Sequence, residues 1–158
     1  MKTKIYLAGA IGCYGENNEY PREWRKQACE WFEIYSSYAY GYDFLCINPM
    51  DYYEYGKDYH KTEREVMLFD LRKLLSCDLV LVNLTDIEKS PGTIGEIMYA
   101  WIKNIPIVGF MESDEVINND SIVKNGLLHP WIYEQIDRIE TGTNAQKKAM
   151  GYIKDYYG

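Results

Sequence analysis

A glutamate that follows a cluster of small residues is the part of this sequence best suited to chemistry. Glu96 comes after an unbroken apolar run over residues 79–84 and a turn-like segment over residues 90–95. The apolar run is typical of a strand buried on both faces, and the segment after it is expected to open a helix. Backbone N–H groups at such a helix start suit a sugar hydroxyl or a phosphate. A carboxylate here can point into the crevice at the carboxyl end of the strand, where open α/β sheets bind ligands. The small residues of the segment are Ser90, Gly92, Thr93 and Gly95.

A second carboxylate, Asp70, lies inside an apolar stretch over residues 68–71. The stretch belongs to an expected helix over residues 62–75, with Thr62 as its N-cap and Glu65 as the partner in a capping box. An aspartate in such a place is either at the exposed edge of the apolar stripe or held inside for a reason. Exposed acidic residues are the more common case. The residues alone leave both interpretations open.

The first strand and the helix after it offer two further candidate contacts. Residues 4–9 form an expected strand that runs into small residues at 9–12, which either let a ligand approach the backbone or simply make a tight turn. Arg22 and Arg25 lie in the first turns of an expected helix over residues 21–35, where cations are unfavourable beside the helix dipole. They either serve an anionic ligand or form a solvated basic face.

Alternating strand and helix patterns place these residues in one α/β domain over residues 1–158. The alternation predicts a three-layer sandwich around a mostly parallel sheet of about five strands. The polar, Tyr-rich segment 48–61 is expected to be a binding loop or lid, and 112–125 a loop with a short helix. The further strands are expected at residues 42–47, 79–84, 105–110 and 136–139, and the further helices at 93–103 and 143–157.

The composition excludes several classes of function. The formal net charge of −7 leaves no basic stripe for a nucleic acid polymer, although a single nucleotide needs only a few local donors. The 4 cysteines are scattered and there are only 2 histidines, so we expect free thiols, no metal site and a cytoplasmic protein. No apolar run approaches membrane-spanning length, and the N-terminus has no signal-peptide pattern. The 16 tyrosines suit base stacking or subunit interfaces, although compositional bias is the simpler explanation.

Several short motifs stand in order between residues 6 and 110. They are Tyr6-Leu7-Ala8-Gly9, Trp24-Arg25, Asn48-Pro49, Asp70, Asp78 to Leu84, Ser90-x-Gly92-Thr93-x-x-Glu96-x-x-x-Ala100 and Pro106 to Phe110. In their order and spacing these motifs resemble the nucleoside 2-deoxyribosyltransferase-like family. The resemblance implies a flavodoxin-like fold and cleavage of the N-glycosidic bond of nucleosides or nucleotides, with a free nucleobase as the second small-molecule partner. It implies no metal or organic cofactor, and homo-oligomers in which a neighbouring subunit completes each site.

The resemblance also implies roles for individual residues. Glu96 matches the catalytic nucleophile of the family, and Asp70 matches a carboxylate that moves protons at the departing or incoming base. Tyr6 and Gly9 fall where the family shapes its sugar pocket. The other residues expected to bind substrate are Ser90, Gly92, Thr93, Arg25 and Asn48.

Three functions are compatible with this resemblance. The favoured one is transfer of deoxyribose from a 2′-deoxynucleoside to an acceptor base through a covalent glycosyl-Glu96 intermediate, as in nucleotide salvage. The second is hydrolysis of 2′-deoxynucleoside 5′-monophosphates by the same residues. It is suggested by Ser90, because some transferases of the family carry an Asp at that position and a hydroxyl accepts a phosphate more readily than a carboxylate does. The third is a non-catalytic nucleotide-binding module, which the presence of both Glu96 and Asp70 disfavours.

Overall fold

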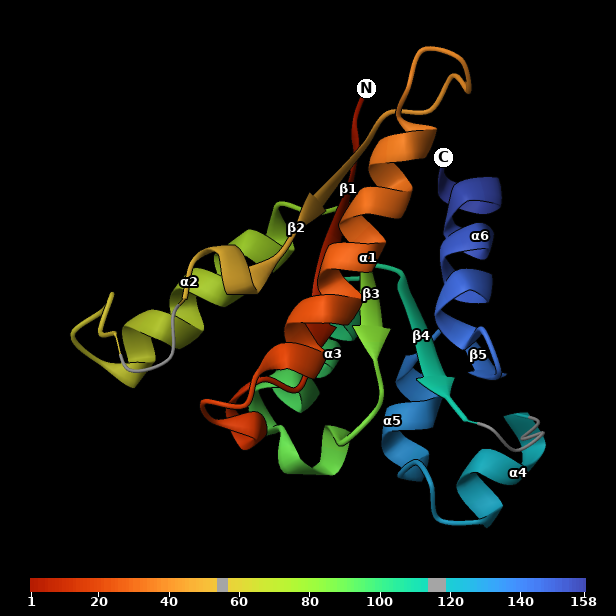
Figure 1. Cartoon of the computed structure of the whole chain (residues 1–158). Helices are drawn as coiled ribbons and strands as arrows, with labels where there is room; N and C mark the ends of the chain where they lie inside the picture. The colour runs from red at the N-terminus through yellow and green to blue at the C-terminus, as the bar shows by residue number, and fades with distance from the viewer. Residues whose placement is uncertain (54–56, 114–118) are drawn as a thin grey trace.

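One parallel sheet runs through the part of the chain that the computed structural model describes, residues 1–53, 57–113 and 119–158. Its five strands have the order β2-β1-β3-β4-β5 and all pair in parallel (Figure 1). This is the strand order of flavodoxin-like folds, so the predicted α/β sandwich is confirmed. The strands are β1 (Thr3–Gly9), β2 (Phe44–Ile47), β3 (Leu79–Asn83), β4 (Ile107–Glu112) and β5 (Arg138–Gly142).

Helices cover both faces of this sheet. On one face α1 and α6 contribute Trp24 and Ile153 to a buried cluster, and on the other α3 and α5 contribute Ile97 and Ile132. No helix in the described ranges combines the length and the apolar character needed to cross a bilayer. The helices are α1 (Glu19–Tyr35), α2 (Glu63–Leu75), α3 (Pro91–Ile102), α4 (Asn119–Lys124), α5 (Pro130–Gln135) and α6 (Ala145–Tyr157).

Successive residues of β1 point to opposite faces of the sheet, as the pleat of a strand requires. Ile5 and Leu7 belong to the core beneath α1 and α6, whereas Tyr6 and Ala8 belong to the core beneath α3 and α5. All four side chains are at most 1% exposed. The alternation therefore commits Tyr6 to the layer that contains α3.

The start of α2 is fixed by the predicted capping box. Thr62 Oγ1 accepts a hydrogen bond from the backbone N–H of Glu65 at 3.1 Å. Glu65 Oε2 in turn accepts from the backbone N–H of Lys61 at 2.7 Å, one residue before the N-cap that the motif predicts. The helix packs against α3, and Leu74 is its one fully buried side chain. The N-terminus of α2 is therefore well capped, but the helix buries little of its surface in the core.

Three strands begin two residues later than predicted. β2 covers 44–47, β4 covers 107–112 and β5 covers 138–142, whereas the sequence predicted 42–47, 105–110 and 136–139. Pro106 explains the shift of β4, because proline has no N–H to donate to a sheet. α4 is the short helix expected within 112–125. Residues 54–56 and 114–118 of the two predicted loops lie outside the described residues.

Candidate active site

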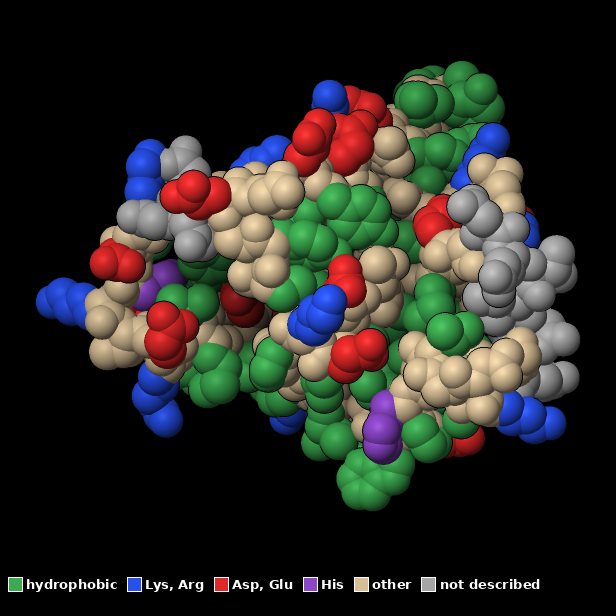
Figure 2. Space-filling view, turned by 60° about the horizontal axis from the view of Figure 1, so that its bottom comes forward, with side chains coloured by type: hydrophobic (Ala, Val, Ile, Leu, Met, Phe, Trp, Pro, Cys, Tyr) green, Lys and Arg blue, Asp and Glu red, His purple; other side chains and the backbone are tan. Residues whose placement is uncertain are grey.

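A cavity of about 480 Å³ lies between α2 and α3. Three carboxylates line it, Glu63 and Asp70 from α2 and Glu96 from α3, and two glycines of α3, Gly92 and Gly95, line it as well. Most of the remaining lining is apolar. Figure 2 shows a recess in which acidic atoms lie deep among hydrophobic ones. The structure thus brings the two predicted catalytic carboxylates to one cavity.

Glu96 is held in the cavity with one oxygen unpaired. Oε2 is buried and has no hydrogen-bond partner among the described residues. Burial, together with the charge of Asp70, raises the pKa of Glu96 to about 7, although hydrogen bonding from the Tyr6 hydroxyl lowers it. A buried carboxylate with a free oxygen is costly to a fold unless a ligand engages it. Near neutral pH, Glu96 therefore exists in both protonation states.

The Tyr6 hydroxyl hydrogen-bonds to Glu96, and the charges of Glu96 and Asp70 both affect its pKa. Burial and the charges of Glu96 and Asp70 raise the pKa of its hydroxyl, so Tyr6 stays protonated and can donate. A neutral donor next to a buried carboxylate stabilises the ionised form of that carboxylate. The position predicted to shape the sugar pocket thus contacts the predicted nucleophile.

Asp70 is half-buried and faces the same cavity from α2. Its Oδ1 accepts a hydrogen bond from the Tyr53 hydroxyl at 2.9 Å. Burial raises the pKa of Asp70, while the Tyr53 hydrogen bond and the nearby His60 act to lower it. Of the two interpretations that the sequence left open, the structure favours the inward one.

The start of α3 has the open character that its small residues suggest. A Cβ placed on Gly92 or Gly95 would meet no atom within 4 Å, so both leave free space in the cavity. Ser90 immediately precedes the helix, and its hydroxyl hydrogen-bonds to that of Thr93 at 2.7 Å. Thr93 is only 2% exposed, so this pair of hydroxyls is partly enclosed.

Arg25 is completely buried, and each of its three side-chain nitrogens donates to a backbone carbonyl. Nε donates to Leu7 at 3.3 Å, Nη1 to Pro21 at 3.0 Å and Nη2 to Gly9 at 2.9 Å. Its guanidinium carbon also lies 4.5 Å from the ring centroid of Trp24. These bonds tie α1 to the end of β1, so the side chain is neither on a solvated basic face nor at the surface of the cavity.

Gly9 and Asn48 have structural environments of their own. A Cβ on Gly9 would lie 3.0 Å from Cζ2 of Trp24 and 3.4 Å from Nη2 of Arg25, so glycine is needed there for packing. Asn48 caps a short helical turn by accepting at Oδ1 from the backbone N–H of Met50 at 3.0 Å. Neither residue lines the cavity between α2 and α3. Their predicted contacts with substrate remain predictions.

Sequence reasoning missed the tyrosines that connect the loops around the site. The Tyr14 hydroxyl donates to Oδ2 of Asp86 at 2.6 Å, and the Tyr20 hydroxyl accepts from Nδ2 of Asn83 at 3.1 Å. The first bond joins the segment after β1 to the segment after β3, and the second joins the first turn of α1 to the end of β3. Tyr53 makes the corresponding bond to Asp70. The abundance of tyrosine was the available signal, but a hydroxyl's partner depends on contacts that sequence spacing does not reveal.

Comparisons with known proteins find a matching family and similar folds. A family model described as nucleoside 2-deoxyribosyltransferase matches residues 5–150. A conserved protein from Enterococcus faecalis V583 has a similar structure, with a TM-score of 0.64 and 17% identity over 98% of this chain and 99% of that one. A 2-deoxyribosyltransferase from Bacillus psychrosaccharolyticus gives a TM-score of 0.60 and 16% identity over 95% and 92% of the two chains. At such identities these two structures support the fold. No curated protein matches the sequence.

Proposed function

The chain belongs to the nucleoside 2-deoxyribosyltransferase family, and from that premise we propose that it transfers deoxyribose from a 2′-deoxynucleoside to an acceptor base through a covalent bond to Glu96. The observation that carries this proposal is the unpaired, buried Oε2 of Glu96 in a cavity shared with Asp70. A nucleophile needs a free oxygen and little water around it, and Glu96 has both.

The reaction divides into two balanced halves. In the first, a Glu96 oxygen bonds to C1′ of the sugar as the N-glycosidic bond breaks, and the electron pair of that bond leaves with the base. Asp70 supplies the proton that the departing base takes up. In the second, a nitrogen of the incoming base attacks C1′, its proton returns to Asp70, and Glu96 is released as a carboxylate. The chemistry requires no metal and no organic cofactor.

The two carboxyl groups need opposite protonation states in the first half-reaction. Glu96 must be ionised to attack, and Asp70 must carry a proton to release the base. Burial and the Asp70 charge raise the pKa of Glu96 to about 7. A proton bound to Asp70 removes that charge and lowers the pKa of Glu96, which favours the ionised form that attacks the sugar. Tyr6 assists by donating toward Glu96 and stabilising its charge.

Hydrolysis of a 2′-deoxynucleoside 5′-monophosphate is the second candidate, and the enclosed hydroxyl pair of Ser90 and Thr93 favours it. Hydroxyls at the start of a helix are suitable donors to a phosphate. Water would then take the place of the acceptor base in the second half-reaction. The three side-chain nitrogens of Arg25 already donate to backbone carbonyls, so the hydroxyls and the backbone N–H groups of α3 would bind the phosphate.

We also infer that the enzyme works in the cytoplasm as a homo-oligomer. Around the cavity, α2 and α3 expose large apolar side chains, among them Met67 at 50% and Ile102 at 58%. Such side chains are typical of surfaces covered by another protein chain. A sedimentation experiment that finds only monomers at the working concentration would contradict the inferred assembly.

A base-exchange assay tests the function directly. The enzyme is mixed with 2′-deoxyadenosine or its 5′-monophosphate together with free cytosine, and the products are separated by chromatography. We expect new deoxycytidine from the nucleoside, and no product with the Glu96→Gln variant. Release of adenine from the monophosphate alone would establish the hydrolase instead. Absence of turnover with either substrate, or undiminished turnover by the variant, would refute the proposed mechanism.

A further inference from the structure

The Tyr53 hydroxyl donates a hydrogen bond to one of the carboxylates of the cavity, at 2.9 Å from Oδ1 of Asp70. It comes shortly after β2, so this bond joins a loop to the middle of α2. The Tyr53 ring lies edge-on to Phe69, with centroids 6.3 Å apart and planes at 77°. Phe69 precedes Asp70 in α2, so the same contact that holds the ring also holds the hydroxyl next to the carboxylate.

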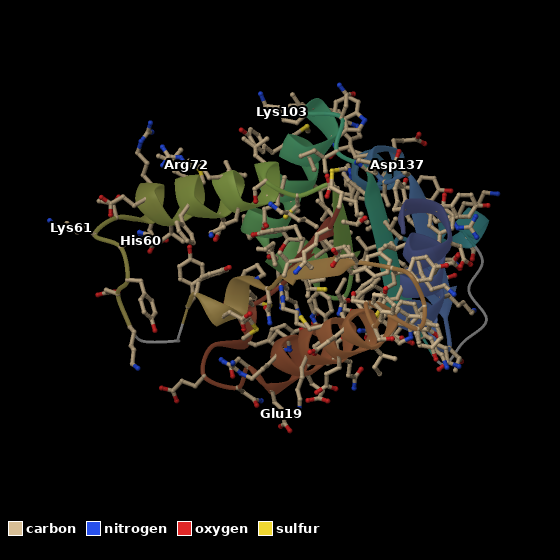
Figure 3. All side chains as sticks on the ribbon, turned by 90° about the horizontal axis from the view of Figure 1, so that it is seen from above. Glu19, His60, Lys61, Arg72, Lys103 and Asp137 are labelled. Carbon is tan, nitrogen blue, oxygen red and sulfur yellow. The ribbon has the colours of Figure 1, made fainter. Side chains whose placement is uncertain are left out.

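An aromatic cluster anchors this loop. The ring of His60 lies 5.2 Å from that of Phe69 and 6.1 Å from that of Tyr53. Tyr59 flanks Tyr53 at 6.3 Å and is 53% exposed. Figure 3 shows His60 beside α2, where the loop leads into that helix. Contacts with the rings of Phe69, His60 and Tyr59 restrict the Tyr53 ring, and a restricted ring presents its hydroxyl in one direction.

The hydrogen bond makes the two oxygens of Asp70 unequal. Oδ1 already accepts from Tyr53, whereas nothing among the described residues donates to Oδ2. When Asp70 takes up a proton, that proton therefore resides on Oδ2, because Oδ1 is occupied as an acceptor. A fixed proton position matters because proton transfer to a leaving group requires hydrogen-bond geometry within a narrow range.

We propose that Tyr53 is a positioning residue of the transfer reaction, which directs Oδ2 of Asp70 at the nucleobase by engaging Oδ1. The inference rests on the proposed function. In the first half-reaction Oδ2 gives its proton to the base nitrogen as the glycosidic bond breaks. In the second, Oδ2 takes the proton of the incoming base, and Tyr53 keeps its own proton throughout.

The test is the Tyr53→Phe variant, with Tyr59→Phe as the matched control. Tyr53→Phe keeps the ring and its packing and removes the hydroxyl alone, and Tyr59→Phe makes the same change on the neighbouring ring. Loss of a hydrogen bond to a charged group corresponds to about a tenfold decrease in kcat/KM for 2′-deoxyguanosine. The control is expected to stay within about twofold of the wild type.

The leaving group separates positioning from a general loss of structure. The base of N7-methyl-2′-deoxyguanosine already carries a positive charge and departs without a proton from Asp70. We expect Tyr53→Phe to slow this substrate less than about threefold, because the general acid contributes little to its departure. Equal slowing of both substrates would mean that Tyr53 acts only on the structure, and would overturn the proposal.

A double-mutant comparison covers any substrate that the wild type accepts. In an Asp70→Asn background, removal of the Tyr53 hydroxyl should change the rate less than about twofold, because the two residues act through one hydrogen bond. A full tenfold loss in that background would overturn the inference while leaving the proposed function intact. If the wild type itself exchanges no base, the proposed function and this inference fail together.

Discussion

Two buried charged side chains, Arg25 of α1 and Glu96 of α3, differ in how they are hydrogen-bonded. Arg25 donates from all three side-chain nitrogens to backbone carbonyls at 2.9 to 3.3 Å. Glu96 has a buried oxygen with no partner among the described residues. Burial shifts both pKa values toward the neutral form, that of Arg25 down to about 10 and that of Glu96 up to about 7. At neutral pH Arg25 nevertheless remains charged, whereas Glu96 is ionised in only part of the molecules.

The difference distinguishes a charge that builds the fold from one that awaits a ligand. A buried group with a hydrogen-bond partner for each of its nitrogens stabilises the structure around it. A buried group with a free atom and a shifted pKa is typical of a functional site. Both residues belong to motifs of the same family, so the motif alone does not separate the two roles.

The largest effect is expected from Glu96→Gln, which keeps the shape of the side chain and removes the charge. Base exchange should fall by more than about a thousandfold, since the proposed covalent step is lost. The free energy of unfolding of the variant should instead exceed that of the wild type near neutral pH. The raised pKa means that folded wild type loses stability as pH rises from about 4.5 to about 7, by about 3 kcal/mol, and the variant should lose less. Urea unfolding at several pH values measures this difference, and identical pH slopes would count against an uncompensated charge.

Asp70→Asn comes next, because it removes the proposed proton donor and keeps the proposed nucleophile. We expect base exchange to slow by about a hundredfold with a smaller change in KM. The Asp70 charge raises the pKa of Glu96, so its removal should lower that pKa. The remaining activity should then rise with pH along a single limb centred below about 7. A limb centred at or above this value would mean that the Asp70 charge does not raise the pKa of Glu96.

Arg25→Met tests the other side of the comparison. It leaves three buried carbonyls without their donor, which should reduce the free energy of unfolding by about 3 kcal/mol. Arg22→Met is the matched control, since Arg22 is exposed on the same helix and should change stability by less than about 0.5 kcal/mol. If Arg25→Met were as stable as the control but lost affinity for 5′-monophosphates, the anion-binding role expected from the sequence would be supported instead.

The smallest effects distinguish two glycines. Gly95→Ala adds a Cβ to open space in the cavity, so it should raise KM while stabilising α3 by up to about 1 kcal/mol. Gly9→Ala places a Cβ 3.0 Å from Trp24 and should destabilise the fold by about 1 to 3 kcal/mol. Parallel measurements of KM and thermal unfolding check both variants, and a destabilised Gly95→Ala would show that the cavity is less open than described.

Patterns along the chain predicted the fold well, because hydrophobic periodicity and capping are local signals. The strands before Gly9 and Asn83, and the capping box of Thr62 and Glu65, all appear in the structure. The cavity itself was predicted less completely. Sequence placed Glu96 and Asp70 as candidates, and the structure puts them in one cavity.

The features that sequence could not give are those that depend on which partner a side chain reaches. Arg25 was expected to be an anion ligand or a surface cation, yet it spans from α1 to the end of β1 inside the core. Tyr53 was one of many tyrosines until its hydroxyl was found next to Asp70. Long side chains have several reachable partners, and tertiary packing selects among them.

The small buried surface of α2 has a consequence for how the enzyme loses activity on heating. This helix carries Asp70 but fully buries only Leu74, whereas α1 buries five residues, among them Trp24 and Phe32. Segments with few buried contacts open locally at a lower free energy than the whole domain. The amides of α2 should therefore exchange with solvent before those of α1. Activity will then be lost at a temperature where most of the sheet is still folded, and a bound nucleoside that fills the cavity will raise that temperature.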